Sequence, residues 1–450
     1  MPAPAGAFDF APVERYALDV SPRSVGVGDL DQDGDQDLLA ASYPGAMTVL
    51  RNDGHGRFRA GEVFGGGPGP TIVHLADVDA DGHLDGVVGD YDAPAVTVLL
   101  GRGDATFEPA RTFRTAASGV IEAEVADLDG DGDLDIATAD SFGSTVSVLL
   151  GDGDGDFRRG DDLLVGFYPR ELEASDFDRD GRQDLAIVGN TNGETVHIAR
   201  GRGDGRFDVI GRYRAGVNAS SVAIHDVDGD RRDDLLVTAD GTNDLTILQG
   251  AGDGTFTVAS VLPTRSYPYS VAVADFDDDG REDLVVGHTQ ADVVSLFAGS
   301  AAGRFGPRQD LDVGLPPTQV VVAPLDANRS PDLVLAGFGS LGQRHPVGVA
   351  FNRIPSRDAV APTIEIARPA EGSTYRLGEP VAVQYRCADD AELITCTGTV
   401  PDGGWLDTST PGEHRFEVRA RDRAGNEARA ERRYDVSPLP CLWLLARCAV

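Results

Sequence analysis

The chain has 450 residues, of which 74 are aspartate or glutamate and 39 are arginine, with no lysine, and its formal net charge is −35. A surface of this sign repels phosphate backbones, which argues against nucleic-acid binding. Hydrophobic residues make up 41% of the chain, too many for wholesale disorder. No apolar run approaches the roughly 18 residues of a membrane-spanning helix. The excess carboxylates are either a solvated surface or clusters that hold cations, and their positions decide which.

An acidic nine-residue motif, D-x-D-x-D-G-x-x-D, recurs at intervals of 48 to 50 residues. A degenerate seventh copy, PLDANRSPD, follows after one more repeat length, at residues 324–332. A glycine-rich turn that ends in phenylalanine keeps the same period. The six acidic copies begin at Asp29, Asp77, Asp127, Asp176, Asp226 and Asp275, and the turns end at Phe58, Phe107, Phe157, Phe207, Phe256 and Phe305. Two signals with one period identify repeats of about 49 residues.

Each repeat is predicted to form four short strands. In the sixth repeat, runs rich in β-branched residues cover 270–274, 284–287 and 293–297, and a fourth follows Phe305. No segment within the repeats sustains a helical period. Four strands in each of seven repeats predict an all-β fold, a seven-bladed β-propeller over residues 8–353. Residues 8–20 align with the strand that the seventh copy lacks, so we expect them to complete the last blade and close the ring.

The acidic motif has the composition of a cation-binding loop. Positions 1, 3, 5 and 9 place carboxylates toward one centre, position 7 offers a main-chain carbonyl, and glycine at position 6 permits the tight turn. An oxygen-only ligand set of this size suits calcium, and no Cys or His at the carboxylate positions argues against zinc. The alternative, an acidic surface turn without an ion, leaves four converging carboxylates to repel one another.

We therefore predict about six structural Ca²⁺ ions. The fifth loop has Arg231 in place of glycine, which makes its affinity less certain, and the seventh, with Pro324 and Asn328, is expected to be empty or weak. The predicted ligands are Asp29, Asp31, Asp33, Asp35 and Asp37; Asp77, Asp79, Asp81, His83 and Asp85; Asp127, Asp129, Asp131, Asp133 and Asp135; Asp176, Asp178, Asp180, Arg182 and Asp184; Asp226, Asp228, Asp230, Arg232 and Asp234; and Asp275, Asp277, Asp279, Arg281 and Asp283.

These repeats resemble the FG-GAP/VCBS repeats of integrin α-subunit-like β-propellers, over about residues 8–352. The resemblance implies an extracellular or cell-surface propeller with structural calcium in the first hairpin loop of each blade and a ligand face at the opposite end. Because we find no catalytic motif, we expect a non-enzymatic adhesion or recognition module and a monomer. No signal peptide is visible in MPAPAGAFDF. The alternatives are a lectin-like protein and a carbohydrate-active lyase or hydrolase that uses the ligand face.

The predicted ligand face carries aromatic and basic residues suited to a protein or glycan ligand. Three inner-strand residues, His74, Glu124 and Glu173, come from consecutive repeats and are expected to meet near the axis. We interpret them as hydrogen-bonding or channel-lining groups, with acid–base catalysis as the alternative. The candidate ligand-binding residues are Tyr43, Tyr91, Tyr168, Arg170, Tyr267 and Tyr269.

The C-terminal quarter has a different pattern. After a linker at 354–362, residues 363–437 alternate as in a small β-sandwich, and the stretch PGEHRFEVRARDRAGN resembles bacterial immunoglobulin-like modules. We predict a disulfide between Cys387 and Cys396, which would agree with an oxidising compartment. The tail at 438–450 has no assigned role, and its Cys441 and Cys448 form a further possible pair.

Overall fold

A computed structural model describes residues 8–191, 193, 195–337, 346–354, 362–388, 393–400, 404–422 and 427–437. The chain divides into two compact units, Met1–Pro355 and Ser356–Val450. The all-β fold class is confirmed. Among the described residues there is no α-helix, and one 3-10 turn, η1 (Ser141–Gly143), is the single helical element.

The N-terminal unit consists, within its described residues, of seven antiparallel sheets with four strands in succession. The first four sheets are β2 (Pro22–Gly28), β3 (Asp37–Ser42), β4 (Ala46–Asn52) and β5 (Phe58–Gly65); β6 (Pro70–Ala76), β7 (Asp85–Asp90), β8 (Ala95–Leu99) and β9 (Arg111–Arg114); β10 (Val120–Ala126), β11 (Asp135–Asp140), β12 (Thr145–Gly151) and β13 (Phe157–Arg159), with β14 (Leu163–Leu164) also on β12; and β15 (Tyr168–Ser175), β16 (Asp184–Asn190), β17 (Val196–Gly201) and β18 (Phe207–Tyr213).

The remaining sheets complete this unit. They are β19 (Ala219–His225), β20 (Asp234–Ala239), β21 (Asp244–Gly250) and β22 (Phe256–Pro263); β23 (Pro268–Ala274), β24 (Asp283–His288), β25 (Val293–Phe297) and β28 (Gln309–Asp312), beside a hairpin of β26 (Gly299–Ser300) and β27 (Arg304–Phe305); and β29 (Gln319–Ala323), β30 (Asp332–Ala336), β31 (Val347–Ala350) and β1 (Glu14–Tyr16). The expected N-terminal strand is thus present, because β1 pairs with β31 as the fourth strand of the last sheet.

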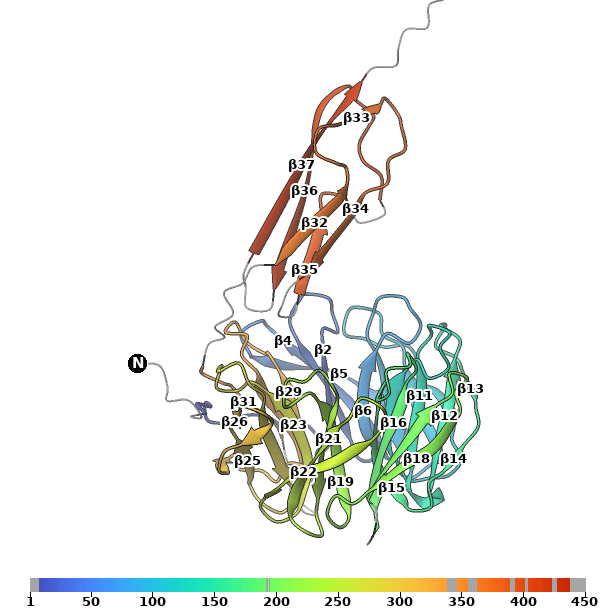
Figure 1. Cartoon of the computed structure of the whole chain (residues 1–450), viewed down its shortest axis with the longest axis vertical. Helices are drawn as coiled ribbons and strands as arrows, with labels where there is room; N and C mark the ends of the chain where they lie inside the picture. The colour runs from blue at the N-terminus through green and yellow to red at the C-terminus, as the bar shows by residue number, and fades with distance from the viewer. Residues whose placement is uncertain are drawn as a thin grey trace, which may run out of the picture. The chain divides into compact units, whose positions relative to one another are not determined.

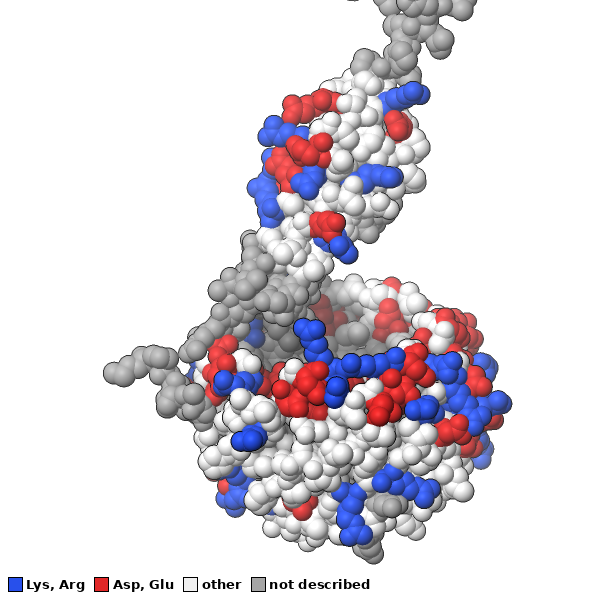
Figure 2. Space-filling model, viewed as in Figure 1, with Lys and Arg blue, Asp and Glu red and all other residues white. Residues whose placement is uncertain are grey.

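The first strand of each sheet lies innermost. Each of β2, β6, β10, β15, β19 and β23 contacts the first strand of the next sheet, and β29 contacts β2, so these seven strands form a closed cycle around the middle of the unit (Figure 1). The surface charge is mixed on the face seen in Figure 2, where acidic and arginine side chains alternate along a band of this unit.

The strand register places every acidic motif at the same end of the unit. The first hairpin of each sheet closes on the ninth residue of the motif, as in Gly28↔Asp37 and Ala126↔Asp135. The seventh copy has the same register, Ala323↔Asp332. The starts of the innermost strands, such as Pro22, therefore lie at the opposite end.

Aromatic residues join neighbouring sheets. In four of the six glycine turns, the terminal phenylalanine packs edge-to-face on an aromatic side chain of the preceding sheet, as in Tyr16–Phe58, with ring centroids 5.3 Å apart, and Phe64–Phe107, at 5.2 Å. Such pairs contribute about 1 kcal/mol beyond the area they bury. The periodic phenylalanine is therefore a packing residue between sheets.

The C-terminal unit has two sheets and one core. The strands β32 (Thr363–Arg368) and β34 (Gln384–Ala388) form one sheet, and β33 (Ser373–Arg376), β37 (Glu427–Ser437), β36 (Gly412–Asp422) and β35 (Leu393–Gly398) form the other. Buried residues between them include Val383, Phe416 and Tyr434. The predicted disulfide is confirmed, with Cys387 and Cys396 5.9 Å apart at Cα. Cys441 and Cys448 lie outside the described residues.

Candidate metal loops and central pocket

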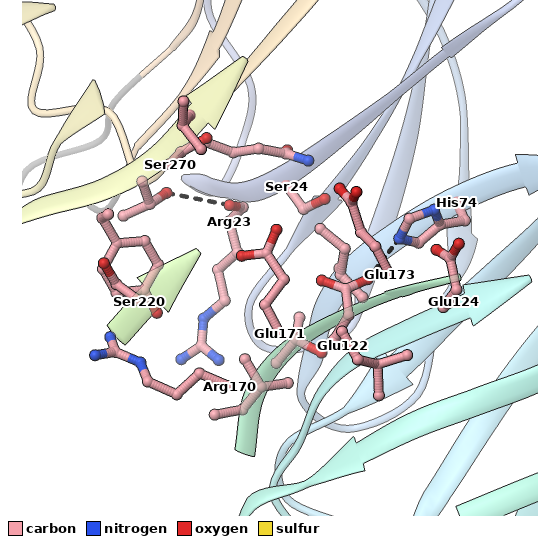
Figure 3. Close-up of a pocket in the computed structure, with 18 of the residues that line it drawn as sticks. Arg23, Ser24, His74, Glu122, Glu124, Arg170, Glu171, Glu173, Ser220 and Ser270 are labelled. Carbon is pink, nitrogen blue, oxygen red and sulfur yellow. Dashed lines mark hydrogen bonds and ion pairs between the residues drawn. The ribbon is translucent and has the colours of Figure 1, made fainter. Parts of the chain in front are cut away.

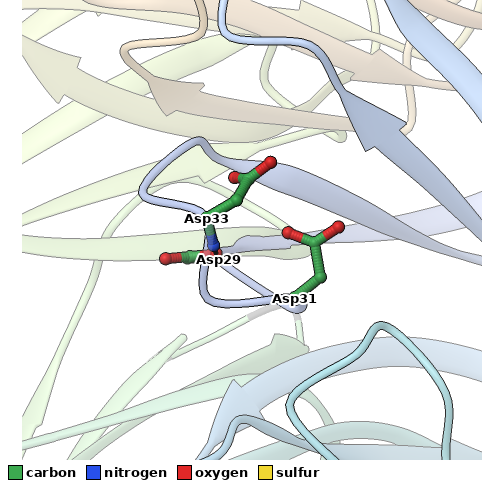
Figure 4. A group of neighbouring side chains, drawn as sticks. All are labelled: Asp29, Asp31 and Asp33. Carbon is green, nitrogen blue, oxygen red and sulfur yellow. Dashed lines mark hydrogen bonds between the residues drawn. The ribbon is translucent and has the colours of Figure 1, made fainter.

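Each acidic loop folds around the carboxylate at its first position. In the first loop, Asp29 accepts the N–H groups of Asp33, at 3.1 Å, and Gly34, at 3.0 Å. Figure 4 shows Asp29, Asp31 and Asp33 projecting from this single turn. Carboxylate oxygens of these three residues lie within 4.8 Å of one another, and groups of the same kind occur in the loops that begin at Asp77, Asp127, Asp176 and Asp226. In the second and fourth loops, the group contains the ninth residue, Asp85 or Asp184.

The sixth position of each loop adopts a left-handed backbone. Gly34 has φ +93°, and Arg231, which replaces glycine in the fifth loop, has φ +66°. The fifth loop therefore keeps the turn with a residue for which this conformation costs about 1 kcal/mol.

The ninth residue also has a structural role. Asp135 is fully buried, and its two oxygens accept the N–H groups of Leu128 and Gly151, each at 2.8 Å. This carboxylate fastens its loop to the end of the third strand. The same pair of hydrogen bonds, one to each carboxylate oxygen, occurs at Asp37, Asp85, Asp234 and Asp283. At Asp135 and Asp283, Oδ2 accepts a second N–H, but Oδ1 keeps a second lone pair, so a ligand role for position 9 is compatible with these hydrogen bonds.

Basic side chains from the later strands approach the third position. Arg51 lies 3.7 Å from Asp31, Arg158 lies 3.7 Å from Asp129, and the Nε of Arg200 lies 2.7 Å from Asp178. These contacts could not be predicted from the motif, because they join residues about 20 to 30 positions apart. They orient the carboxylate, as outer partners do around metal ligands.

The loops have the chemistry of a cation site. The Oδ1 atoms of Asp31 and Asp279 are buried and accept no hydrogen bond. Burial raises the pKa of Asp29, and it raises that of Asp275 to about 6. A cation would supply the missing partner and favour the ionised form. The residues therefore fit a hard, oxygen-preferring metal ion.

The seventh loop is satisfied without a cation. Asp326 accepts the N–H of Asn328, and the Asn328 side chain donates to the carbonyl of Asn352 at 2.6 Å and accepts the N–H of Ser330 at 2.8 Å. Asp332 accepts two backbone N–H groups, as position 9 does elsewhere. Neutral side chains thus replace the carboxylates at positions 5 and 7 of the first loop.

A pocket of about 470 Å³ lies among the innermost strands. Its walls come from all seven of these strands, and it includes residues at their starts, such as Arg23, Thr71 and Ser220. It therefore extends toward the end opposite the acidic loops. Its volume falls in the range of small-molecule sites.

One wall of the pocket carries carboxyl groups that are bonded across sheets. His74 Nε2 lies 2.5 Å from Glu122 Oε1, and the Ser221 hydroxyl donates to Glu171 Oε1 at 3.2 Å. Burial alone would lower the pKa of His74, but the negative field of Glu122 and its neighbours raises it to about 9. Burial raises the pKa of Glu171 well above its usual value. Figure 3 shows these groups around the pocket.

As expected, His74, Glu124 and Glu173 lie close together, in this wall of the pocket. Glu124 accepts the N–H of Ala174, at 3.3 Å, and Glu173 accepts that of Ile224, at 3.0 Å, so both carboxyls bond to the next sheet. These bonds support our first interpretation of the two glutamates. Burial and the neighbouring Glu124 raise the pKa of Glu173 to about 8, so an acid–base role is also compatible.

Arginine and tyrosine line another part of the pocket. The Arg170 guanidinium lies 4.7 Å from the Tyr269 ring centroid and 2.8 Å from Asp240, and Arg23 lies 5.9 Å from the centroid of Tyr91. Of the candidate ligand residues, Tyr91, Arg170 and Tyr269 line the pocket. The other three are exposed outside this lining: Tyr43, which lies under Arg23, and Tyr168 and Tyr267.

Glu122 and Glu171 were not among the residues predicted from the sequence. Both stand five residues before an acidic motif, two before Glu124 and Glu173. Because alternate residues of a strand share a face, the position five before the motif faces the axis as well. Reading both positions in every repeat would have found all four carboxyl groups.

The comparisons identify the family. The family model of the FG-GAP-like repeat matches residues 29–88, 77–138, 127–187, 176–237 and 226–286. These overlapping matches span more than half of the chain, which therefore belongs to the FG-GAP-like repeat family. No curated protein matches the sequence.

Solved structures share the propeller fold. BBS1N from its complex with ARL6DN aligns with TM-score 0.55 and 8% identity, over 79% of this chain and 99% of that one. A putative 6-phosphogluconolactonase from Bacteroides fragilis aligns with TM-score 0.53 and 16% identity, over 67% and 87%. A protein from Lactobacillus plantarum aligns with TM-score 0.51 and 19% identity, over 66% and 85%. At these identities the likeness concerns the fold alone.

One expectation is corrected by this comparison. We expected a non-enzymatic protein because no catalytic motif was found. A protein described as a putative lactonase has the same fold, so this argument does not exclude catalysis. Separately, no helix among the described residues is long and apolar enough to cross a membrane.

Proposed function

We propose that this chain is an extracellular, seven-bladed, calcium-loaded propeller with an immunoglobulin-like domain, and that it recognises a protein or glycan ligand at the end opposite the calcium loops. The observation that carries the calcium assignment is the repeated loop, in which carboxylates at positions 1, 3 and 5 or 9 converge. The many oxygen donors favour calcium over magnesium, which keeps more of its waters. The disulfide agrees with an oxidising compartment.

In this proposal the ions stabilise the scaffold. Each loop closes the first hairpin of a sheet, and its ninth residue ties that hairpin to the third strand. A cation held there would neutralise the carboxylates and fix the rim of the innermost strands. The opposite end, with Arg23, Tyr91 and Tyr269, is left for recognition.

Calcium titration of metal-stripped protein tests this function. We expect about six ions per chain by calorimetry and a rise in Tm of more than about 10 °C, since one site at 100 times its Kd contributes roughly 2.7 kcal/mol. Magnesium at the same concentration is the control and should give a much smaller rise. An unchanged Tm in EDTA, with no metal found by elemental analysis, would refute the calcium assignment.

A second candidate is hydrolysis or elimination on a carbohydrate. It is favoured by His74 and Glu173 in one pocket, with pKa values raised to about 9 and about 8. A carboxyl group that stays protonated at neutral pH, as this pKa of Glu173 implies, can act as a general acid. Release of reducing or unsaturated ends from a polysaccharide panel tests it. Turnover that is lost in His74→Asn, with the calcium content unchanged, would support catalysis, and no turnover on the panel would count against it.

A further inference from the structure

The carboxyl groups of the central pocket lie on one wall. Glu122 and Glu124 lie on β10, and Glu171 and Glu173 lie on the neighbouring strand β15. The other sheets contribute no carboxyl group to the lining, and their polar side chains include the hydroxyls of Ser24, Ser220 and Ser270. Figure 3 shows the carboxyl groups gathered on one side of the pocket, apart from Ser220 and Ser270.

The carboxyl wall has more acids than cations. His74 is bonded to Glu122, whereas the partners found for Glu124, Glu171 and Glu173 are neutral: two backbone N–H groups and one hydroxyl. A buried carboxylate with neutral partners is unfavourable unless it takes up a proton or gains a cation. The raised pKa values of Glu171 and Glu173 agree with this imbalance.

A second zone of the pocket suits the opposite charge. Arg23 and Arg170 project side by side in Figure 3, and both stack near tyrosine rings. Arg170 is anchored by Asp240, which fixes its planar guanidinium. Guanidinium groups recognise carboxylate and carbonyl oxygens with defined geometry. The pocket thus offers an anionic wall and a cationic zone within about 470 Å³.

We propose that the central pocket binds an organic cation, a guanidinium or an ammonium group, seated against Glu124, Glu171 and Glu173, on a ligand whose carboxylate or carbonyl lies toward Arg23 and Arg170. This inference rests on the proposed recognition function and names the chemistry of its ligand. The cation stabilises the ionised carboxyls, so binding near neutral pH releases protons. The other charged groups that face these three glutamates are Glu122, His74 and Arg170, whose positive charge opposes the rise in the pKa of Glu171.

Calorimetry on the full chain in saturating calcium tests the proposal. L-arginine and L-lysine are the probes, and citrulline, a neutral analogue of arginine, is the matched control ligand. We expect arginine to bind at least about tenfold more tightly than citrulline, because a charged hydrogen bond is lost with citrulline. The heat should differ between buffers of different ionisation enthalpy, which reports proton release. Peptides with arginine at the C-terminus or in the interior distinguish a free amino acid from a peptide end as the source.

Two conservative variants locate the site. Glu173→Gln keeps an oxygen to accept the Ile224 N–H, and Glu171→Gln keeps one for Ser221. Each should weaken arginine binding about tenfold or more. The control is Glu108→Gln, because Glu108 lies outside the pocket and pairs with Arg111. The arginine-dependent rise in Tm of the unaltered chain is a readout that does not depend on any variant folding.

Several results would overturn the proposal. Arginine and citrulline could bind equally, or neither arginine nor lysine could bind. The affinity for arginine could be unchanged in both glutamine variants. The pocket could also prefer neutral or acidic sugars, or hold a divalent metal that is lost with Glu171→Gln. Sugar binding would leave the recognition function intact. If calcium fails to bind to the loops while arginine still binds in the pocket, the calcium assignment alone fails.

Discussion

The seventh acidic loop has the same strand register as the first six, but it has neutral residues at positions where the others have carboxylates. All seven close the first hairpin of a sheet, and in the seventh, as in Asp135, the ninth carboxylate accepts two backbone N–H groups. At positions 1 and 5, however, the seventh loop has Pro324 and Asn328 in place of aspartate. Its hydrogen bonds are satisfied by neutral side chains. The difference separates residues that build the loop from residues that hold a cation.

The largest expected effect is on the free energy of unfolding, and it separates backbone bridging from cation binding at position 9 of the loops. Asp332→Asn places an amide N–H₂ against a backbone N–H, and we expect a loss of about 2 kcal/mol of unfolding free energy, equal with calcium and with EDTA. Asp135→Asn should cost the same in EDTA and more in calcium, because it also weakens a metal loop. Denaturant unfolding under both conditions measures this. An Asp332→Asn variant as stable as the parent would contradict the structural role.

A smaller effect is expected from the cation positions. The double variant Asp129→Asn with Asp131→Asn should bind one calcium ion fewer and lose about 1.4 kcal/mol when calcium is ten times its Kd. In EDTA the same variant should be slightly more stable than the parent, since two repelling charges are gone and each asparagine keeps an oxygen to accept its loop N–H. Asp326→Asn is the control and should leave the ion count unchanged. A destabilisation of the same size in EDTA would show that these carboxylates act without a cation.

The smallest effect concerns the backbone of the fifth loop. Arg231→Gly relieves a left-handed conformation at φ +66°, and we expect a gain of about 0.5–1 kcal/mol in calcium. Arg232→Gly, at the next position, is the control and should give no gain. Thermal unfolding of both variants measures the difference. A gain from Arg232→Gly alone would mean that charge, rather than backbone strain, limits this loop.

Much of the fold was predictable because the repeat carries it. The spacing of the acidic motifs located the hairpin loops, and alternation within each repeat predicted strands that the structure contains. The N-terminal strand was predicted from the missing fourth strand of the last repeat, and β1 pairs with β31. The disulfide followed from two cysteines close in sequence. These features are local or periodic, so one chain is enough to read them.

The pocket was only partly predictable. Tyr91, Arg170 and Tyr269 line it, whereas Tyr43, Tyr168 and Tyr267 lie outside its lining, although all six were assigned to one end of the ring. Which aromatic residue turns toward the axis depends on loop geometry between strands, and this is not periodic. The bonds from Ala174 to Glu124 and from Ile224 to Glu173 join residues about 50 positions apart.

The sequence by itself determined the repeat, the all-β class and the positions of the acidic loops, because each is encoded within about 49 residues and repeated. The tertiary structure alone decided which polar side chains contact one another within and between the sheets. It gave the ninth aspartate a backbone-bridging role, brought Arg51 to Asp31, and gathered Glu122 and Glu171 beside His74 in one pocket. Side chains from different sheets meet only when the innermost strands pack around a common centre.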